Sequence, residues 1–405
     1  AEPHLTGRRV EVLTVQDPGA SRCLLDAALR RRPALIIDGL FGIGLNRPLD
    51  ADWINLMGVI NASGVPVLAV DLPSGIHADT GEAFGAAVQA AVTLTLGAPK
   101  TGLLRPPAWA AVGRLEVEPD IGLTPCPWAG EMQWTVSEDF AGYPGARAVA
   151  THKGCFGHLV IMAGSQGYHG AAVLAARGAQ RARPGLISLH TAPPVYTPVA
   201  SQLQAVMVHG WRAEARWPEA ISAALCGPGL AASDLPDDLR EAVLALWRDA
   251  DHPVIMDASA LDWLPSTSTA TGGIRVITPH PGEAARMLGA SVADVQRDRA
   301  AALRALSRRY GACWVVLKGH QTLVGCQAGP IFVNSTGNPY LAQGGSGDLL
   351  AGYMAGLLAQ PELQGDPALA VRYAVWEHGA AADRLTAHRR NWVVEDLASE
   401  LGAAG

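Results

Sequence analysis

A glycine-rich segment that runs directly into an apolar helix constrains this chain more than any other stretch. Residues 334–348 read NSTGNPYLAQGGSGD, and residues 349–358 form an apolar run suited to a helix. Small residues before a helix leave its first N–H groups accessible, so this turn is a ready-made anion site. Asp348 stands where the anion would lie, which favours a base acting on a hydroxyl or water beside a phosphate. The alternative is that Asp348 only caps the helix and the glycines only form a turn.

Short apolar strands alternate with helical segments along the rest of the chain, which predicts an α/β fold with parallel sheets. Ligands of such sheets bind beyond the carboxyl ends of the strands. Asp38 and Asp71 each follow a short apolar run and stand beside glycines, although either could instead be a helix cap or a turn former. We expect strands at residues 9–15, 34–38, 66–70, 158–163, 186–190, 253–256, 275–278 and 313–317.

The length of 405 residues exceeds one ordinary hydrophobic core and predicts two domains. A stretch rich in Pro, Gly and Trp at residues 119–144 marks the boundary between them. We therefore expect a first domain over residues 1–125, a linker over residues 126–150 and a larger domain over residues 151–405.

Composition argues against several classes of protein. The formal net charge is −6 and no basic run stands out, so we expect no nucleic-acid partner. No apolar run approaches the length of a membrane span and the first residues do not resemble a secretory signal, so we expect a cytoplasmic protein without a membrane partner. The six cysteines are scattered without a C-x-x-C pair, which indicates neither a zinc site nor a disulfide framework. A Walker-type phosphate loop is absent as well.

A few basic residues stand out as candidates for phosphate chemistry. Of the 31 Lys and Arg residues only Lys100, Lys153 and Lys318 are lysines, and each lies near a glycine. A lysine can act as a compact phosphate partner in a tight pocket, where a guanidinium does not fit. His280 lies between two prolines, which hold it in an extended turn where it either positions a substrate group or is structural. The loop at residues 318–322 follows a strand and could wrap a nucleoside, with residues 345–347 holding its terminal phosphate.

In combination, these motifs resemble a known family. Residues 152–158 (HKGCFGH), 278–283 (TPHPGE), 316–319 (VLKG) and 334–348 look like the carbohydrate-kinase-like dehydratase domain of bacterial NAD(P)H-hydrate repair enzymes. Residues 38–45 (DGLFGIGL) and 70–75 (VDLPSG) resemble the second half of the Rossmann-like epimerase domain that is fused ahead of it. The resemblance covers nearly the whole chain. It implies a truncated Rossmann-like domain followed by a larger ribokinase-like α/β domain.

The resemblance also implies an activity for the larger domain. It would dehydrate (S)-NAD(P)HX to NAD(P)H with ADP (or ATP), by phosphorylating the ring hydroxyl and then eliminating the phosphate, with AMP and phosphate as products of ADP. Mg²⁺ would bridge the phosphates. Asp348 would be the base, and Gly229 and His280 would line the hydrate with it. The residues implied to line the adenine nucleotide are Lys318, Gly319, His320, Gln321, Thr322 and Gly347.

The smaller domain would, by the same resemblance, interconvert the R and S forms of NAD(P)HX. Asp38 and Ser74 match positions that hold K⁺, and Asp71 matches a substrate-binding acid. The loop implied to lie at the dinucleotide comprises Gly42, Ile43, Gly44, Leu45, Asn46, Arg47 and Pro48. The family's epimerase half begins with an N-N-G-G-D-G turn and this chain starts after it, so we expect an incomplete epimerase domain. A homo-oligomer is also expected.

Departures from the family pattern lie in the larger domain. Cys155 stands where an Asp is usual, Ser259 interrupts the usual D-A-D-A-L, and Arg183 and Pro184 replace small residues. Two other interpretations remain open. One is a ribokinase-like small-molecule kinase, because the G-G-S-G-D anion site is similar in that superfamily. The other is a catalytically inactive nucleotide-binding scaffold.

Overall fold

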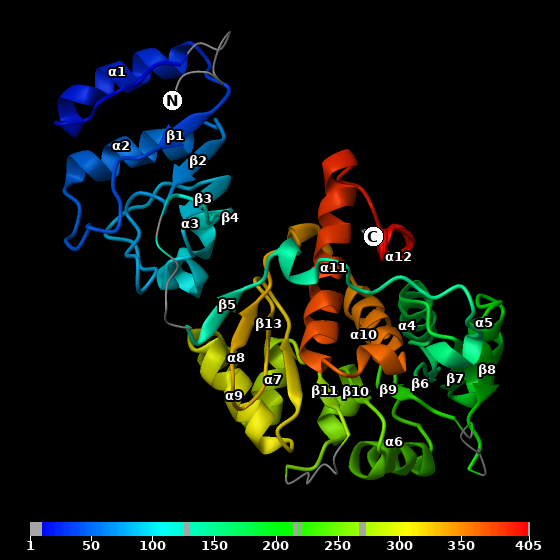
Figure 1. The fold of residues 1–405 in the computed structure, drawn as a ribbon. Helices are drawn as coiled ribbons and strands as arrows, with labels where there is room; N and C mark the ends of the chain where they lie inside the picture. Colours follow the sequence, from blue (N-terminus) through cyan, green and yellow to red (C-terminus); the bar gives the residue numbers. More distant parts are fainter. Residues whose placement is uncertain are drawn as a thin grey trace. The chain divides into compact units, whose positions relative to one another are not determined.

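The computed structural model describes residues 10–122, 124, 130–213, 218, 220–266 and 273–403. The chain divides into two compact units, Ala1–Pro127 and Trp128–Gly405 (Figure 1). Residues 10–15, for which the sequence predicts a strand, adopt neither helix nor strand. Among the helices of the described ranges, none has both the length and the apolar character that crossing a bilayer requires.

The first unit is built on a four-stranded sheet in the order β1-β2-β3-β4, and all three pairs of neighbouring strands are parallel. The strands are β1 (Ile36–Asp38), β2 (Val67–Val70), β3 (Val92–Leu96) and β4 (Arg114–Glu118). The helices are α1 (Pro18–Arg30), α2 (Ala51–Ala62) and the short α3 (Trp109–Val112), with 3₁₀ turns η1 (Thr101–Leu104) and η2 (Pro106–Ala108). Asp50 begins α2 because its carboxylate accepts the N–H groups of Asp52 and Trp53. Met57 and Ile60 of α2 then pack on Val67 of β2 in a small buried core.

The second unit contains a ten-stranded mixed sheet in the order β5-β14-β13-β12-β11-β10-β9-β6-β7-β8. Pairing is parallel except at β12–β13 and β13–β14, which are antiparallel. Every residue of β6 is buried, as expected where helices cover both faces of a sheet. The strands are β5 (Met132–Trp134), β6 (His158–Met162), β7 (Leu186–Thr191), β8 (Met207–Gly210), β9 (Ala223–Cys226), β10 (Val254–Met256), β11 (Arg275–Ile277), β12 (Trp314–Leu317), β13 (Leu323–Gly325) and β14 (Ile331–Val333).

The stretch predicted to be a linker contributes to this sheet. β5 lies within residues 126–150 and pairs in parallel with β14, with Met132 opposite Ile331 and Trp134 opposite Val333. The following turn η3 (Ser137–Phe140) buries Phe140 against Tyr373. Part of the expected linker is therefore a structural element of the second unit.

Helix α10 (Ser346–Leu358) lies in the centre of the second unit, beside α4 (His169–Ala182) and α11 (Pro367–His388) (Figure 1). It is apolar on all sides, which suits a buried helix. Glycines let it approach α4 closely, because a Cβ on Gly352 would lie 1.9 Å from the Ala175 carbonyl oxygen. The remaining helices are α5 (Tyr196–Ala200), α6 (Asp237–Asp249), α7 (Pro281–Leu288), α8 (Val292–Arg297), α9 (Arg299–Arg309) and α12 (Val394–Glu400). Further 3₁₀ turns are η4 (Lys153–Phe156), η5 (Pro193–Val195), η6 (Ala258–Trp263), η7 (Pro339–Leu341) and η8 (Pro361–Leu363).

Candidate active site

The candidate site of the second unit lies at the carboxyl ends of four neighbouring parallel strands. The sheet order β12-β11-β10-β9 brings together the loops that follow these strands. Lys318 follows β12, His280 lies three residues after β11, Asp257 follows β10, and Gly229 lies three residues after β9. This edge is where ligands of parallel sheets bind. Residues from segments far apart in the sequence therefore meet at the sheet edge where we expect a ligand to bind.

Lys318 is the cation at the centre of this site. Its ammonium donates a hydrogen bond of 2.8 Å to Oδ1 of Asp257, and it lies 3.8 Å from Oε2 of Glu283. Burial alone would disfavour the ammonium, but the carboxylates of Asp257, Glu283 and Asp348 outweigh it and raise the pKa of Lys318. The lysine thus carries its positive charge throughout the neutral range.

Asp257 is fixed by a second contact, because its Oδ1 also accepts the Thr278 hydroxyl at 2.6 Å. Asp257 and Glu283 are both buried, with 1% and 6% of their surface exposed. In the sequence, Asp257 directly follows the strand predicted at residues 253–256, and Glu283 is the last residue of the motif at residues 278–283. Their pairing with Lys318 depends on strand order, which periodicity alone does not give.

Asp348 lies in the first turn of α10, as the glycine-rich segment predicts. The preceding Gly345 has a φ of +91°, and a Cβ there would lie 2.3 Å from Leu174 Cδ1, so this turn requires glycine. A Cβ on Gly347 would lie 3.5 Å from the Lys318 ammonium, which therefore faces the start of α10. Burial and the nearby Asp257 raise the pKa of Asp348 to about 6, although Lys318 opposes this. A carboxylate with this pKa is ionised at neutral pH and is a stronger base than an ordinary aspartate.

His280 begins α7 in a reciprocal capping arrangement. Its Nδ1 accepts the N–H groups of Gly282 (3.0 Å) and Glu283 (3.3 Å), while Oε2 of Glu283 accepts the His280 N–H at 2.7 Å. Because Nδ1 is an acceptor, the neutral ring carries its proton on Nε2. The side chain is 53% exposed, and its Nε2 lies 3.5 Å from Oε1 of Glu283.

Arg299, which the sequence motifs do not indicate, holds the loop at residues 318–322 through hydrogen bonds to backbone carbonyls. Its guanidinium donates to the carbonyl oxygens of His320 (2.5 Å) and Leu317 (3.0 Å). Burial lowers the pKa of Arg299 to about 10, so the side chain stays charged. The loop is also bent sharply, with φ values of +132° at Gly319 and +51° at Gln321. Thr322 closes it by donating its hydroxyl to the Gly319 carbonyl at 3.0 Å.

Gly229 belongs to a turn that lies against the same site. A Cβ on Gly229 would lie 2.5 Å from the Tyr168 carbonyl oxygen, and its own carbonyl accepts the Ser165 hydroxyl at 2.6 Å. Gly227, two residues earlier, approaches Asp257 so closely that a Cβ would lie 1.8 Å from the Asp257 carbonyl oxygen. The structure thus brings the turn of Gly229 beside the Asp257–Lys318 pair.

In the first unit, Asp38 and Ser74 meet as a buried pair. The Ser74 hydroxyl donates to Oδ1 of Asp38 at 2.7 Å, and the Ser74 N–H donates to Oδ2 at 2.8 Å. The two residues are only 3% and 1% exposed. Their oxygens are of the type that a hard cation prefers. Throughout the described ranges, however, no group of three or more His, Cys, Asp and Glu side chains gathers around a possible metal position.

Asp71 directly follows β2, three residues before Ser74, and pairs with Lys100. It adopts a left-handed backbone with a φ of +71°, and its Oδ1 accepts the Leu96 N–H at 3.0 Å and the Lys100 ammonium. The Asp71 carboxylate is thus held in place by one of the three lysines. Residues 42–48 lie within the loop between β1 and α2, where the Leu45 N–H donates to the Gly42 carbonyl in a tight turn. Within the described part of the chain, this loop and Asp71 share no hydrogen bond or ion pair.

Comparison with known protein families gives two matches. Residues 159–403 match the family model described as NAD(P)H-hydrate dehydratase, and residues 8–102 match the model of the YjeF-related protein N-terminus. A bifunctional NAD(P)H-hydrate repair enzyme of Gloeobacter violaceus is 39% identical over 378 residues, which cover 87% of this chain and 71% of that protein. One from Escherichia coli is 35% identical over 378 residues, covering 91% and 70%.

Solved structures give a consistent result. An ADP/ATP-dependent NAD(P)H-hydrate dehydratase of Bacillus subtilis, co-crystallised with ATP/Mg²⁺, is 34% identical with a TM-score of 0.57, and the match covers 64% of this chain and 92% of that one. A ribokinase-like superfamily protein of Enterococcus faecalis, 23% identical, has a TM-score of 0.57 over 69% of this chain and 97% of its own, and supports the fold alone. The ribokinase-like α/β fold predicted from the sequence is confirmed.

Proposed function

Because the chain belongs to the family of bifunctional NAD(P)H-hydrate repair enzymes, we propose that its second unit dehydrates (S)-NAD(P)HX to NAD(P)H with ADP or ATP. With ADP the other products are AMP and phosphate. The observation that carries the proposal is Asp348, a half-buried carboxylate with a raised pKa at the start of α10 and beside the Lys318 ammonium. This arrangement suits proton removal from a hydroxyl next to a phosphate.

The reaction runs in two steps. Asp348 takes the proton of the ring hydroxyl while the hydroxyl oxygen attacks the terminal phosphorus of the nucleotide. A new O–P bond forms, and the bond between that phosphorus and the oxygen of the leaving nucleotide breaks. The ring C–O bond of the resulting phosphate ester then breaks, phosphate leaves, and the neighbouring ring carbon loses a proton to restore the double bond. Lys318 supplies positive charge close to the transferred group throughout.

The second unit has groups suited to both ends of the nucleotide, the nucleoside and the terminal phosphate. We propose that the loop of residues 318–322 lines the adenine nucleotide and that the N–H groups at the start of α10 receive its terminal phosphate. The absence of a side chain at Gly347 allows the phosphate to approach. Mg²⁺ usually takes one or two carboxylates together with substrate phosphates. Asp257 and Glu283 fit that role, and the ion would neutralise charge on the transferred phosphoryl group.

A second activity is proposed for the first unit, the interconversion of (R)- and (S)-NAD(P)HX. The buried Asp38–Ser74 pair supports this proposal, because it places carboxylate and hydroxyl oxygens together, the type of ligand that a hard cation such as K⁺ accepts. Asp71 and the loop of residues 42–48 would bind the dinucleotide. This activity should require K⁺, and Asp38→Asn should abolish it while leaving the dehydration of pure (S)-NADHX unchanged.

The test is recovery of the near-ultraviolet absorbance of NADH from a mixture of (R)- and (S)-NADHX. Recovery of about half of the substrate, only with nucleotide, supports an active dehydratase alone, and recovery of nearly all supports both activities. Asp348→Asn should lower the dehydration rate by about 10²-fold or more. No recovery with either ADP or ATP refutes the proposal. Accumulation of a stable phosphorylated product, with one ATP consumed per product, would favour the ribokinase-like kinase instead.

A further inference from the structure

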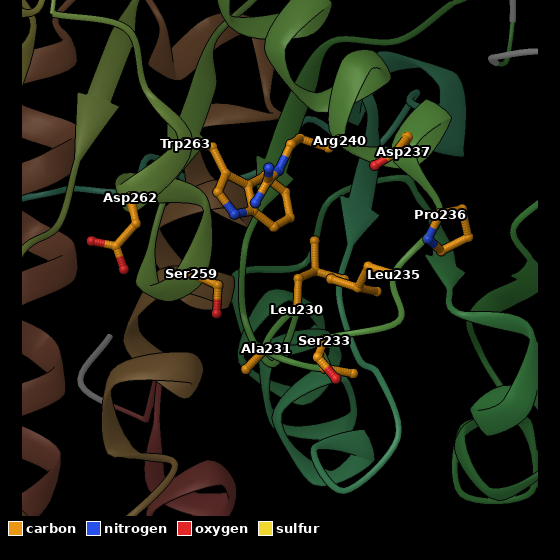
Figure 2. A pocket seen from close by; sticks show the side chains of 11 residues that line it. Leu230, Ala231, Ser233, Leu235, Pro236, Asp237, Arg240, Ser259, Asp262 and Trp263 are labelled. Atoms are coloured by element: carbon orange, nitrogen blue, oxygen red, sulfur yellow. The ribbon is translucent and has the colours of Figure 1, made fainter.

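A pocket of about 410 Å³ lies beside the candidate active site, between the start of α6 and the turn η6 (Figure 2). Its volume is within the range typical of small-molecule sites. Leu230 and Leu235 line one part of it, while Arg240, Ser259 and Trp263 contribute polar and aromatic groups. None of the site residues implied by the family resemblance lines this pocket, so the proposal for the reacting groups leaves it unexplained.

Some residues that line the pocket are close in the sequence to residues of the candidate active site. Leu230 directly follows Gly229, and Ser259 lies two residues after Asp257, the partner of Lys318. The close approach of Gly227 to Asp257 joins these two segments at the carboxyl ends of β9 and β10. A ligand whose reacting ring lies near Gly229 and Asp348 therefore has the pocket within reach of its remaining part.

Arg240 is the group in the pocket that can recognise charge. Its guanidinium lies over the Trp263 ring, 5.0 Å from the centroid, and Figure 2 shows the two side chains superimposed. Such stacking holds the guanidinium in a defined place. Within the described residues, its side chain makes no hydrogen bond or ion pair. All five of its N–H donors are thus available for a ligand.

Two acids near Arg240, Asp262 and Asp237, form no ion pair with its guanidinium in the described part of the chain. Asp262 pairs with Arg286 at 3.1 Å and, in Figure 2, points away from Arg240. Asp237 lies one helical turn before Arg240, and its carboxylate suits the hydroxyl groups of a ribose. The combination of a stacked guanidinium, serine hydroxyls and an acid matches a ribose phosphate better than an apolar ligand.

Resting on the proposed dehydratase function, we propose that this pocket binds the nucleotide half of the substrate distal to the reacting ring, with Arg240 contacting one of its phosphates. Trp263 is a positioning residue, because it acts by holding the guanidinium. The phosphate is either the pyrophosphate common to NADHX and NADPHX or the additional phosphate carried only by NADPHX. Kinetics with both substrates distinguish these sources.

The experiment compares the full chain with its Arg240→Gln, Arg240→Lys and Trp263→Leu variants in steady-state dehydration of (S)-NADHX and (S)-NADPHX. Arg240→Gln should raise KM by about 10-fold, the loss expected for a charge-assisted hydrogen bond, with kcat within about twofold of the wild type. Arg240→Lys should recover part of the affinity and Trp263→Leu should lose part of it. Arg248→Gln is the matched control, because Arg248 lies on the same helix and pairs with Asp249.

The outcomes separate cleanly. A higher KM for both substrates assigns the pyrophosphate to Arg240, and a higher KM for NADPHX alone assigns the additional phosphate. An unchanged KM for both substrates overturns the inference, as does a higher KM for ADP instead, which would assign the pocket to the co-substrate. A wild-type chain that dehydrates neither substrate refutes the proposed function itself.

Discussion

The carboxylate that we propose as the base should destabilise the ligand-free protein, so Asp348→Asn should unfold less readily while losing activity. Burial and neighbouring acids raise the pKa of Asp348 from 3.8 to about 6. A group whose pKa is higher in the folded state contributes no penalty below the unfolded pKa, and its penalty is complete above the folded pKa. The wild type should therefore lose stability from this group as the pH rises from about 4 to about 6.

The magnitude follows from the same values. A pKa difference of about 2 corresponds to about 3 kcal/mol. Because the side chain is not fully buried, we expect Asp348→Asn to gain about 1–2 kcal/mol at neutral pH after allowance for solvent screening. The gain should vanish near pH 4. A stability that increases as activity falls distinguishes a functional charge from a structural cap, whose loss would destabilise the helix.

The assay is urea unfolding without nucleotide or Mg²⁺, at neutral pH and at about pH 4, followed by a probe placed in the second unit because the two units need not unfold together. Asp257→Asn is the matched control. It removes the same charge from the same site but deprives the Lys318 ammonium of its 2.8 Å partner, so it should destabilise. A variant Asp348→Asn that is no more stable than the wild type at neutral pH, or that gains as much at about pH 4, would show that the Asp348 charge does not destabilise the fold.

Three further outcomes follow from the site. The kcat/KM of dehydration should fall as the pH drops through about 6, because protonated Asp348 is not a base; a profile flat through this range contradicts the assignment. Gly345→Ala should lower the free energy of unfolding by about 1–3 kcal/mol and reduce kcat, since a Cβ meets Leu174 at a φ of +91°; thermal unfolding and initial rates measure both. Arg299→Lys should raise the KM for ADP more than the KM for (S)-NADHX, because a lysine cannot hold both the His320 and Leu317 carbonyls. Equal changes in the two KM values would show that Arg299 supports the unit as a whole.

Structural features that local chemistry determines could be predicted from the sequence. The glycines before Asp348 predict the start of a helix, and α10 begins there at Ser346. The prolines on either side of His280 predict an extended backbone, and His280 has a φ of −80° and a ψ of 168°. Two of the three lysines near glycines, Lys318 and Lys100, each pair with a buried or partly buried acid, and their role as phosphate partners stays a prediction. These features depend on a few neighbouring residues and are therefore visible in the sequence.

Structural features that depend on residues far apart in the chain could not be predicted from the sequence. The alternation at residues 9–15 predicts a strand, but a strand forms only where a neighbour is available to pair, and the described residues 10–15 remain irregular. Arg299 supports the loop of residues 318–322 through backbone carbonyls, which carry no sequence signal. The contact of Asp257 with Lys318 joins residues 61 positions apart and required the order of the strands.

The pairing of β5 with β14 has a practical consequence for separating the two units. A second unit prepared from residue 151 onward, the boundary that composition favours, would lack β5 and leave β14 as an open sheet edge. Such an edge presents unpaired N–H and C=O groups, which are a template for aggregation. It would also expose the site where Phe140 packs on Tyr373. The second unit should therefore be expressed with residues 130–150 attached, so that β14 keeps its pairing partner and Tyr373 keeps its contact with Phe140.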